Sequence, residues 1–184
     1  MRTLPHLIDF ATPSEAAISL HEAGHACAAM VLGIMPAFIE FLDDPASPGI
    51  ARNRIVVLAQ QDRRIVASGA YAVEYALHRA GRLTNRTGEP LSDKEFIQIA
   101  IAGNAAMDKQ MFFNGAFEKP NGCWPPEMDE TFMNFGAALA NTLPMECVFA
   151  IAEAMINERR LDCQRLIEIA TPYLPGAASK WTCG

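Results

Sequence analysis

The chain has 184 residues, of which 51% are hydrophobic and 20% charged, and its formal net charge is −6 at pH 7. Because this length supports one sizeable core, we expect a single domain over residues 1–184. An acidic total without a basic stripe argues against nucleic-acid binding. No membrane segment is expected, since the longest uncharged run, residues 23–39, falls short of the roughly 20 apolar residues that a spanning helix needs.

The N-terminus and the cysteines together indicate a cytoplasmic protein. The first residues lack a basic segment followed by an apolar run, so no secretory signal is apparent. The five cysteines are odd in number, scattered and without a CxxC pair: Cys27, Cys123, Cys147, Cys163 and Cys183. This pattern predicts reduced thiols rather than a disulfide framework.

The first predicted helix begins near residue 12 and stops at Gly33. Thr12, Pro13 and Glu15 have the residue types of an N-cap, a first helical residue and a capping-box partner. Apolar residues occupy most sides of this helix, which indicates that it is buried. Polar side chains inside it must therefore have partners.

Residues 21–25 of this helix read His-Glu-Ala-Gly-His, an HExxH motif. Residues four apart share a helix face, so His21 and His25 can bind one zinc ion through neutral imidazole nitrogens. Glu22 would then lie beside a metal-bound water as its proton acceptor. The alternative is a pair of core histidines satisfied by hydrogen bonds, and the intact spacing argues against it.

Two short strands are predicted after this helix. Residues 37–42 alternate in part between apolar and polar, and residues 43–49 have the composition of a turn. Residues 54–59 are β-branched and apolar, which favours a second strand. Zincin folds set a strand beside the motif helix, where its edge can hold an extended substrate, and either strand could do so.

The rest of the chain is predicted to be mostly helical. Residues 62–81 have apolar positions at helical spacing, and a polar loop at residues 83–90 separates them from a third helix over residues 92–114. A connector rich in Pro and Gly follows at residues 115–126. Three further helices are predicted at residues 127–141, 145–158 and 161–170. The expected fold is mainly α, of the α+β class, with the motif on a buried helix and a small sheet.

A catalytic zinc usually has three protein ligands and an open position, so a third ligand must come from elsewhere in the chain. The remaining histidines are only His6 and His78. His6 lies in an irregular terminus, and His78 is predicted on a helix surface. A carboxylate is therefore favoured as the third ligand.

Several segments resemble the FtsH-type zinc peptidases. Residues 14–26 are similar to the HEAGHA helix of that family, and residues 68–74 to its Gly-Gly-x-Ala-Ala-Glu helix, with Ala70 at the second glycine. Residues 91–93 resemble its Ser-Asn-Asp helix start, which supplies an aspartate ligand. The resemblance covers roughly residues 12–100 and implies a zincin-like fold with Asp93 as the third zinc ligand.

Other carboxylates stay open as the third ligand. Residues 101–108 also resemble the Gly-Gly-x-Ala-Ala-Glu stretch, although Met107 replaces its glutamate, and Asp129 would then be the ligand. Asp108 is a further candidate, and Glu74 would serve in a site of two His and one Glu. No P-loop of the family's ATPase module is seen, so we expect a small stand-alone relative of the peptidase domain.

The sequence therefore predicts a zinc metallopeptidase with Glu22 as general base. Its expected partners are peptides, flexible segments or proteins delivered to it, and the sequence is compatible with a homo-oligomer. The alternative is a non-catalytic zinc-binding module with a regulatory or interaction role. Glu22 separates the two hypotheses, because a purely structural site needs no carboxylate there and commonly closes its fourth position with Cys.

Overall fold

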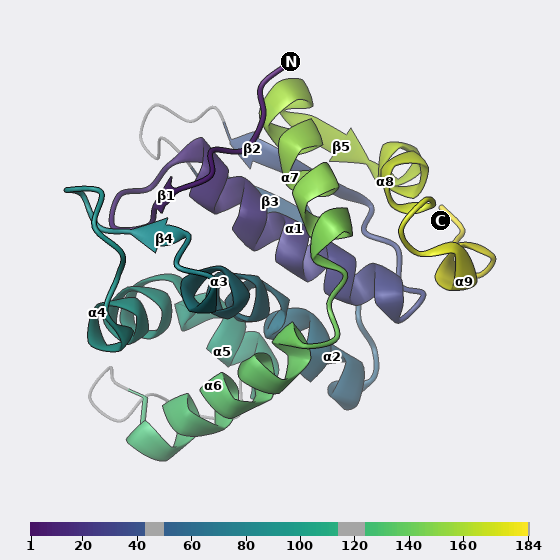
Figure 1. Cartoon of the computed structure of the whole chain (residues 1–184). Coiled ribbons are helices and arrows are strands. Elements are labelled where there is room, and N and C mark those ends of the chain that lie inside the picture. The colour runs from purple at the N-terminus through teal and green to yellow at the C-terminus, as the bar shows by residue number, and fades with distance from the viewer. Residues whose placement is uncertain (43–49, 114–123, 184) are drawn as a thin grey trace.

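The computed structural model describes residues 1–42, 50–113 and 124–183. Over these ranges the protein is mainly helical with a small sheet, which confirms the predicted secondary-structure class (Figure 1). The predicted turn at residues 43–49 and most of the connector at residues 115–126 lie outside the described part of the chain.

Three antiparallel strands form the larger sheet, in the order β3-β2-β5. The central strand β2 (Phe38–Leu42) pairs with β3 (Ile50–Arg54) on one side and with β5 (Arg160–Asp162) on the other. The strand predicted at residues 37–42 is therefore confirmed. A second, two-stranded parallel sheet joins β1 (Ile8–Asp9) to β4 (Leu83–Thr84).

The strand predicted at residues 54–59 corresponds to β3, which begins four residues earlier and ends at Arg54. Its last pair joins Arg54 to Phe38, where β2 begins, so the apolar residues that follow have no partner in this sheet. Val56 and Leu58 are instead 65% and 88% exposed. The prediction was wrong because β-branched composition favours a strand only where a neighbouring strand is present.

The helix with the HExxH motif, α1 (Glu15–Val31), begins slightly later than predicted. Ser14, two residues after the predicted cap Thr12, is the N-cap, and its hydroxyl accepts a hydrogen bond from Ala17 N at 3.1 Å. The helix ends before Gly33, which has a φ of +81° and is thus suited to glycine, as predicted.

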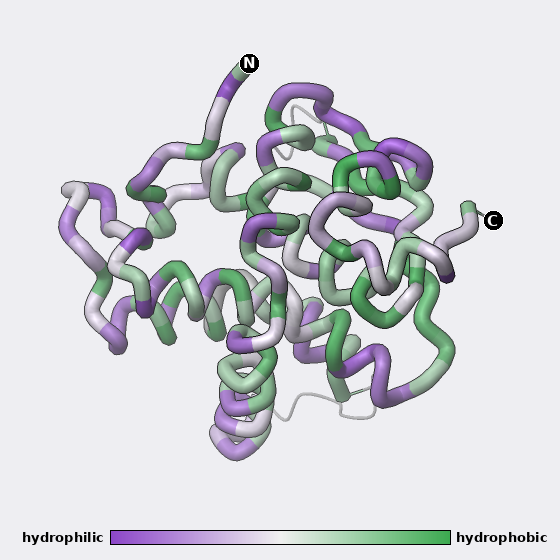
Figure 2. Tube along the Cα trace, turned by 45° about the vertical axis from the view of Figure 1, so that its right-hand side comes forward, coloured by the Kyte–Doolittle hydropathy of each residue, from purple (hydrophilic) through white to green (hydrophobic). Residues whose placement is uncertain are grey.

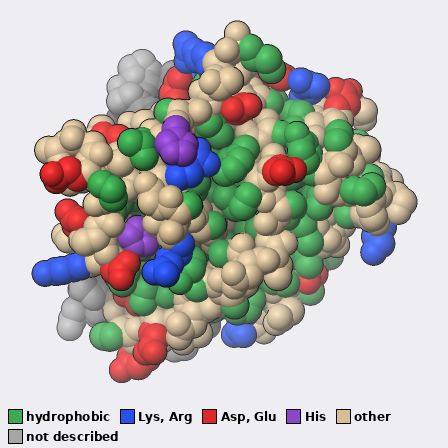
Figure 3. Space-filling model, viewed as in Figure 1, with side chains coloured by type: hydrophobic (Ala, Val, Ile, Leu, Met, Phe, Trp, Pro, Cys, Tyr) green, Lys and Arg blue, Asp and Glu red, His purple; other side chains and the backbone are tan. Residues whose placement is uncertain are grey.

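α1 lies in the middle of the molecule and packs against α3 (Gly69–Arg79) and α7 (Met145–Glu158) (Figure 1). It is buried from Ser19 to Met30 except at His21, which confirms the expectation of a buried motif helix. Apolar residues recur along the helical turns with polar residues between them (Figure 2). On the face of Figure 1, hydrophobic side chains show over much of the middle and charged ones mainly toward the rim (Figure 3).

The helix predicted at residues 62–81 is divided at Ser68 into α2 (Gln60–Ala67) and α3. The break precedes Gly69, which packs directly on α1: a Cβ added at Gly24 would lie 2.6 Å from Gly69 O. Only glycine permits backbones to approach this closely. The two glycines therefore bring α3 against the motif helix.

The helix predicted over residues 92–114 consists of three pieces. α4 (Asp93–Ile97) opens with the expected capping box between Ser92 and Glu95. A π-helical segment, η1 (Gln98–Asn104), follows, and α5 (Ala106–Phe112) completes the run. A single helix was predicted because π-helical turns have no simple sequence signature.

The three helices predicted in the last part of the chain are present as α6 (Pro126–Ala140), α7 and α8 (Cys163–Ala170). The short α9 (Pro175–Ala178) was not predicted. No single helix in the described ranges is long and apolar enough to cross a membrane, although the bent pair of α6 and α7 together meets the criterion of length and composition.

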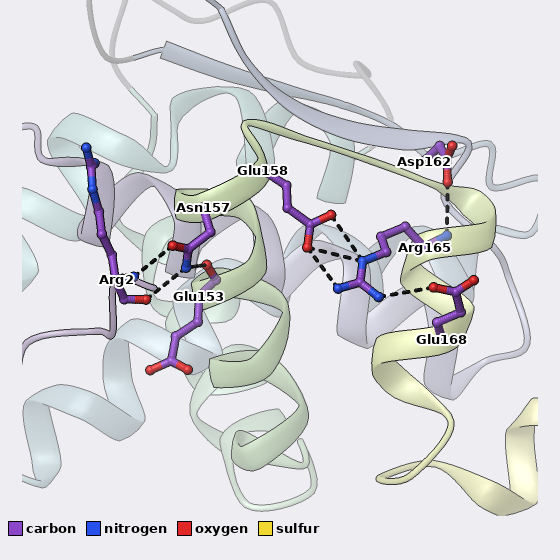
Figure 4. Close-up of polar contacts among 7 residues, drawn as sticks. All are labelled: Arg2, Glu153, Asn157, Glu158, Asp162, Arg165 and Glu168. Carbon is purple, nitrogen blue, oxygen red and sulfur yellow. Dashed lines mark hydrogen bonds and ion pairs between the residues drawn. The ribbon is translucent and has the colours of Figure 1, made fainter.

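Polar contacts join α7 to the N-terminal segment and to α8 (Figure 4). Arg2 N donates to Asn157 Oδ1 at 2.7 Å, which ties the N-terminal segment to α7. Arg165 of α8 donates to Glu158 at 2.9 Å and to Glu168 at 3.0 Å. These contacts are exposed, so each contributes little to the free energy of folding.

A disulfide joins Cys163 to Cys183, which corrects the prediction of uniformly reduced thiols. The two residues are 20 apart in sequence, and only the turn of the chain after α8 brings them together. Trp181, in the same C-terminal segment, donates its Nε1 hydrogen to Met30 O at 3.0 Å, near the end of α1. Cys27 and Cys147 are free and buried, and Cys123 lies outside the described ranges.

We expect Cys183→Ser to lower the free energy of unfolding by about 3 kcal/mol, because the bond restricts an unfolded-state loop of about 20 residues. Urea denaturation without reductant measures this difference. Dithiothreitol should bring the wild type to the stability of the variant and leave the variant unchanged. Equal stability of the oxidised wild type and the variant would contradict a stabilising disulfide.

Candidate metal centre

Three side chains from two helices converge: His21 and His25 of α1 and Asp108 of α5. One ligand atom of each lies within 4.8 Å of the others. His25 Nε2 is 3.1 Å from Asp108 Oδ1, and His21 Nε2 is 3.6 Å from Asp108 Oδ2. Ligands bound to zinc at about 2.0 Å in a tetrahedral site are roughly 3.3 Å apart. The group can therefore hold a metal ion.

The hydrogen bond at Nδ1 of His25 fixes the tautomer of its ring. Its Nδ1 lies 2.7 Å from Val66 O, and a carbonyl oxygen only accepts hydrogen bonds, so Nδ1 must carry a hydrogen. In the neutral ring, the Nε2 lone pair then faces the Asp108 carboxylate. Two acceptors at this separation need a cation between them, which is either a proton or a metal ion.

His21 has a carboxylate behind it. Its Nδ1 lies 2.9 Å from Oε1 of Glu74, which is buried on α3 and reaches the ring because Gly24 and Gly69 let α3 approach α1. Burial alone would lower the pKa of His21, but Asp108 and Glu74 outweigh it and raise that pKa to about 10. The negative charges of Asp108 and Glu74 would also favour a bound metal cation. A carboxylate on the second ring nitrogen, as Glu74 is here, commonly orients a metal-binding histidine.

One carboxylate oxygen of Asp108 makes no hydrogen bond to the described residues. This oxygen, Oδ2, is buried. Burial would raise the pKa of this carboxyl group, but His25 and His21 lower it overall, so the charged form is favoured. A buried carboxylate oxygen without a hydrogen-bond partner is costly, and a bond to a metal ion would satisfy it.

Glu22 is buried beside this group. Its Oε2 accepts a hydrogen bond from Asn53 Nδ2 of β3 at 2.6 Å, and its charge contributes to raising the pKa of both His21 and His25. Asn53 was missed in the sequence, because nothing in its local pattern separates it from any polar strand residue. The structure thus places the predicted general base next to the two predicted histidine ligands.

Of the other candidate ligands, Glu74 contacts His21 from behind the ring, whereas Asp93 is not part of the His21, His25 and Asp108 group. The side chain of Asp93 is 81% exposed at the start of α4 and accepts a hydrogen bond from His78 Nε2 at 2.8 Å. That hydrogen bond lowers the pKa of Asp93. An aspartate in a first helical turn is favoured by the helix dipole without any metal. Asp129 pairs with Lys109 at 2.7 Å, so Asp108 is the carboxylate that joins the histidines.

We expect Glu74→Gln to weaken zinc binding by roughly 10-fold to 100-fold, because a neutral amide accepts a weaker hydrogen bond from His21 Nδ1 than a carboxylate does and leaves the imidazole a weaker ligand. Competition with a chelating dye measures this affinity. Glu146→Gln is the matched control, since Glu146 is an exposed residue of α7. An unchanged affinity in Glu74→Gln would show that this carboxylate does not tune the centre.

Fold and site together define a mainly helical protein with a largely buried group of two histidines and one aspartate that can hold a metal ion. Comparisons with protein-family models, with curated proteins and with solved structures find no match. The likeness to the FtsH-type motif helix therefore rests on the residues quoted above, and functional assignment must come from the site.

Proposed function

We propose that this protein is a zinc-dependent metallopeptidase of zincin-like organisation, with zinc on His21, His25 and Asp108. The observation that carries this proposal is the convergence of two histidine Nε2 atoms on a buried carboxylate, with Glu22 alongside. Two imidazoles and one carboxylate are a typical ligand set for catalytic zinc. Three protein ligands leave a fourth position for water or substrate.

In this proposal each residue has a separate role. A zinc ion held here would supply an acidic bound water and would polarise the scissile carbonyl. Glu22 accepts the proton of the attacking water and delivers it to the leaving amine. Asn53 holds Oε2 of Glu22, which orients the carboxylate and leaves Oε1 for the proton. Glu74 and the carbonyl of Val66 fix the two histidine rings.

The substrates that suit this arrangement are peptides or flexible protein segments. In the described sheet, β3 pairs on one side only, with β2, and Asn53 of β3 contacts Glu22. An extended chain that paired with β3 would therefore pass beside the general base. A folded substrate could not present its backbone in this way.

A chelator assay tests the proposal. The zinc-loaded protein should cleave an unfolded substrate such as reduced, alkylated casein, lose this activity in 1,10-phenanthroline, and regain it when zinc is added back. Cleavage that persists in the chelator would contradict the proposal. So would cleavage activity that elutes separately from this chain on a sizing column.

A zinc-binding module without catalysis is the second candidate. It is favoured by burial, because His25 is 3% and Asp108 7% exposed, and a closed site gives substrate little access. The side chain of His21, however, is 20% exposed, which opens one side of the group to solvent. Both candidates bind a metal ion, but only the metallopeptidase hydrolyses a substrate. The casein assay therefore separates them.

A further inference from the structure

Lys109, the residue after Asp108, is buried and makes contacts that the peptide mechanism does not use. Its side chain is 4% exposed, and its Nζ donates to Asp129 Oδ1 at 2.7 Å and to Ile101 O at 3.1 Å. The ammonium also lies 5.8 Å from the centre of the Trp124 ring. A charged group this buried must be paired, and here its partners come from different parts of the chain.

The two bonded partners belong to the elements on either side of α5. Ile101 lies in η1, the π-helical segment directly before α5, and Asp129 lies in the first turn of α6. π-Helical turns are rare and occur frequently at functional sites. One ammonium group therefore joins η1, α5 and α6.

Asp108 and Lys109 are neighbours on α5 but contact different elements. Successive residues of an α-helix point about 100° apart, so Asp108 can face α1 while Lys109 faces η1 and α6. Because Lys109 is bonded to both η1 and α6, a rotation of α5 about its axis would break its ion pair with Asp129. A ligand oxygen must be placed to within about 0.5 Å, so a small rotation would matter.

We propose that Lys109 is a positioning residue for the metal centre: its ion pair with Asp129 fixes the rotation of α5 that aims Asp108 at His21 and His25. This inference rests on the proposed metal site and gives Asp129 the role of counter-ion. A purely stabilising ion pair would behave differently, since well-packed apolar residues can replace a buried pair at little cost in stability.

The test uses Co²⁺ as the metal probe, because its visible absorption bands report the number and geometry of its ligands. The main variant is the double substitution Lys109→Met with Asp129→Leu, which leaves neither charge unpaired. We expect its Co²⁺ affinity to fall about tenfold and its tetrahedral bands to weaken. Asp129→Glu keeps the ion pair and should retain both, and Lys94→Met is the control at an exposed lysine of α4.

Should the double variant not fold, Asp129→Asn provides the test, since the Asp129 side chain is 29% exposed and tolerates a neutral amide. It should shift affinity and bands in the same direction by a smaller amount. Wild-type affinity and bands in the folded variants would overturn the role of Lys109 and leave the metal site standing. A wild type that binds no Co²⁺ or Zn²⁺ would overturn both.

Discussion

Replacing Glu22 with Gln should abolish peptide hydrolysis while leaving zinc bound at the wild-type level. Gln keeps the shape of Glu22 and can still accept a hydrogen bond from Asn53, but it cannot take a proton from water. General-base catalysis contributes about 10²-fold to 10⁴-fold, so kcat should fall by this factor. Initial rates on a quenched peptide, with zinc content measured on the same sample, give the result.

Glu146→Gln is again the matched control, because it makes the same chemical change at an exposed site. Its rate should equal that of the wild type. Hydrolysis retained in Glu22→Gln would remove Glu22 from the mechanism. A loss of zinc along with activity would instead show that the residue acts through the metal group rather than on the water.

The second large effect is expected at the third ligand. Asp108→Ala should weaken zinc binding by well over the roughly 100-fold that marks the upper range for outer-shell partners, because it removes a direct ligand. Asp93→Ala should bind zinc as the wild type does, since Asp93 is exposed and paired with His78. Both affinities come from one competition titration with a chelating dye.

These two variants also discriminate between the sequence resemblance and the structure. The resemblance to the FtsH-type peptidases implies Asp93, whereas the geometry points to Asp108. Zinc loss in Asp93→Ala with full occupancy in Asp108→Ala would reverse the assignment. Loss in neither variant would exclude both carboxylates as ligands.

The local parts of the fold could be predicted because their signals are local. The HExxH spacing places His21 and His25 on one face of a helix wherever that helix lies. The capping box at Ser92 and the stop at Gly33 depend on a few neighbouring residues, and both are present in the structure. The apolar surroundings of the motif correctly predicted a buried helix.

The choice among the candidate carboxylates and the pairing of the cysteines depend on tertiary contacts. Asp108 reaches the histidines only because η1 and α5 turn the chain back toward α1, and no residue spacing encodes that path. The pairing of Cys163 with Cys183 depends in the same way on the fold of the C-terminal segment. Asp93 is a reminder that a helix-start motif favours an acidic residue whether or not a metal is present.

The most direct test of the account is the metal content of the wild-type protein, measured by elemental analysis after purification without a His tag or a chelator. A centre built from His21, His25 and Asp108 predicts about one zinc per chain. No metal in this sample, and none retained after zinc is added back and excess is removed, would mean that the cation between the histidines and Asp108 is only a proton. The metallopeptidase assignment would then be contradicted.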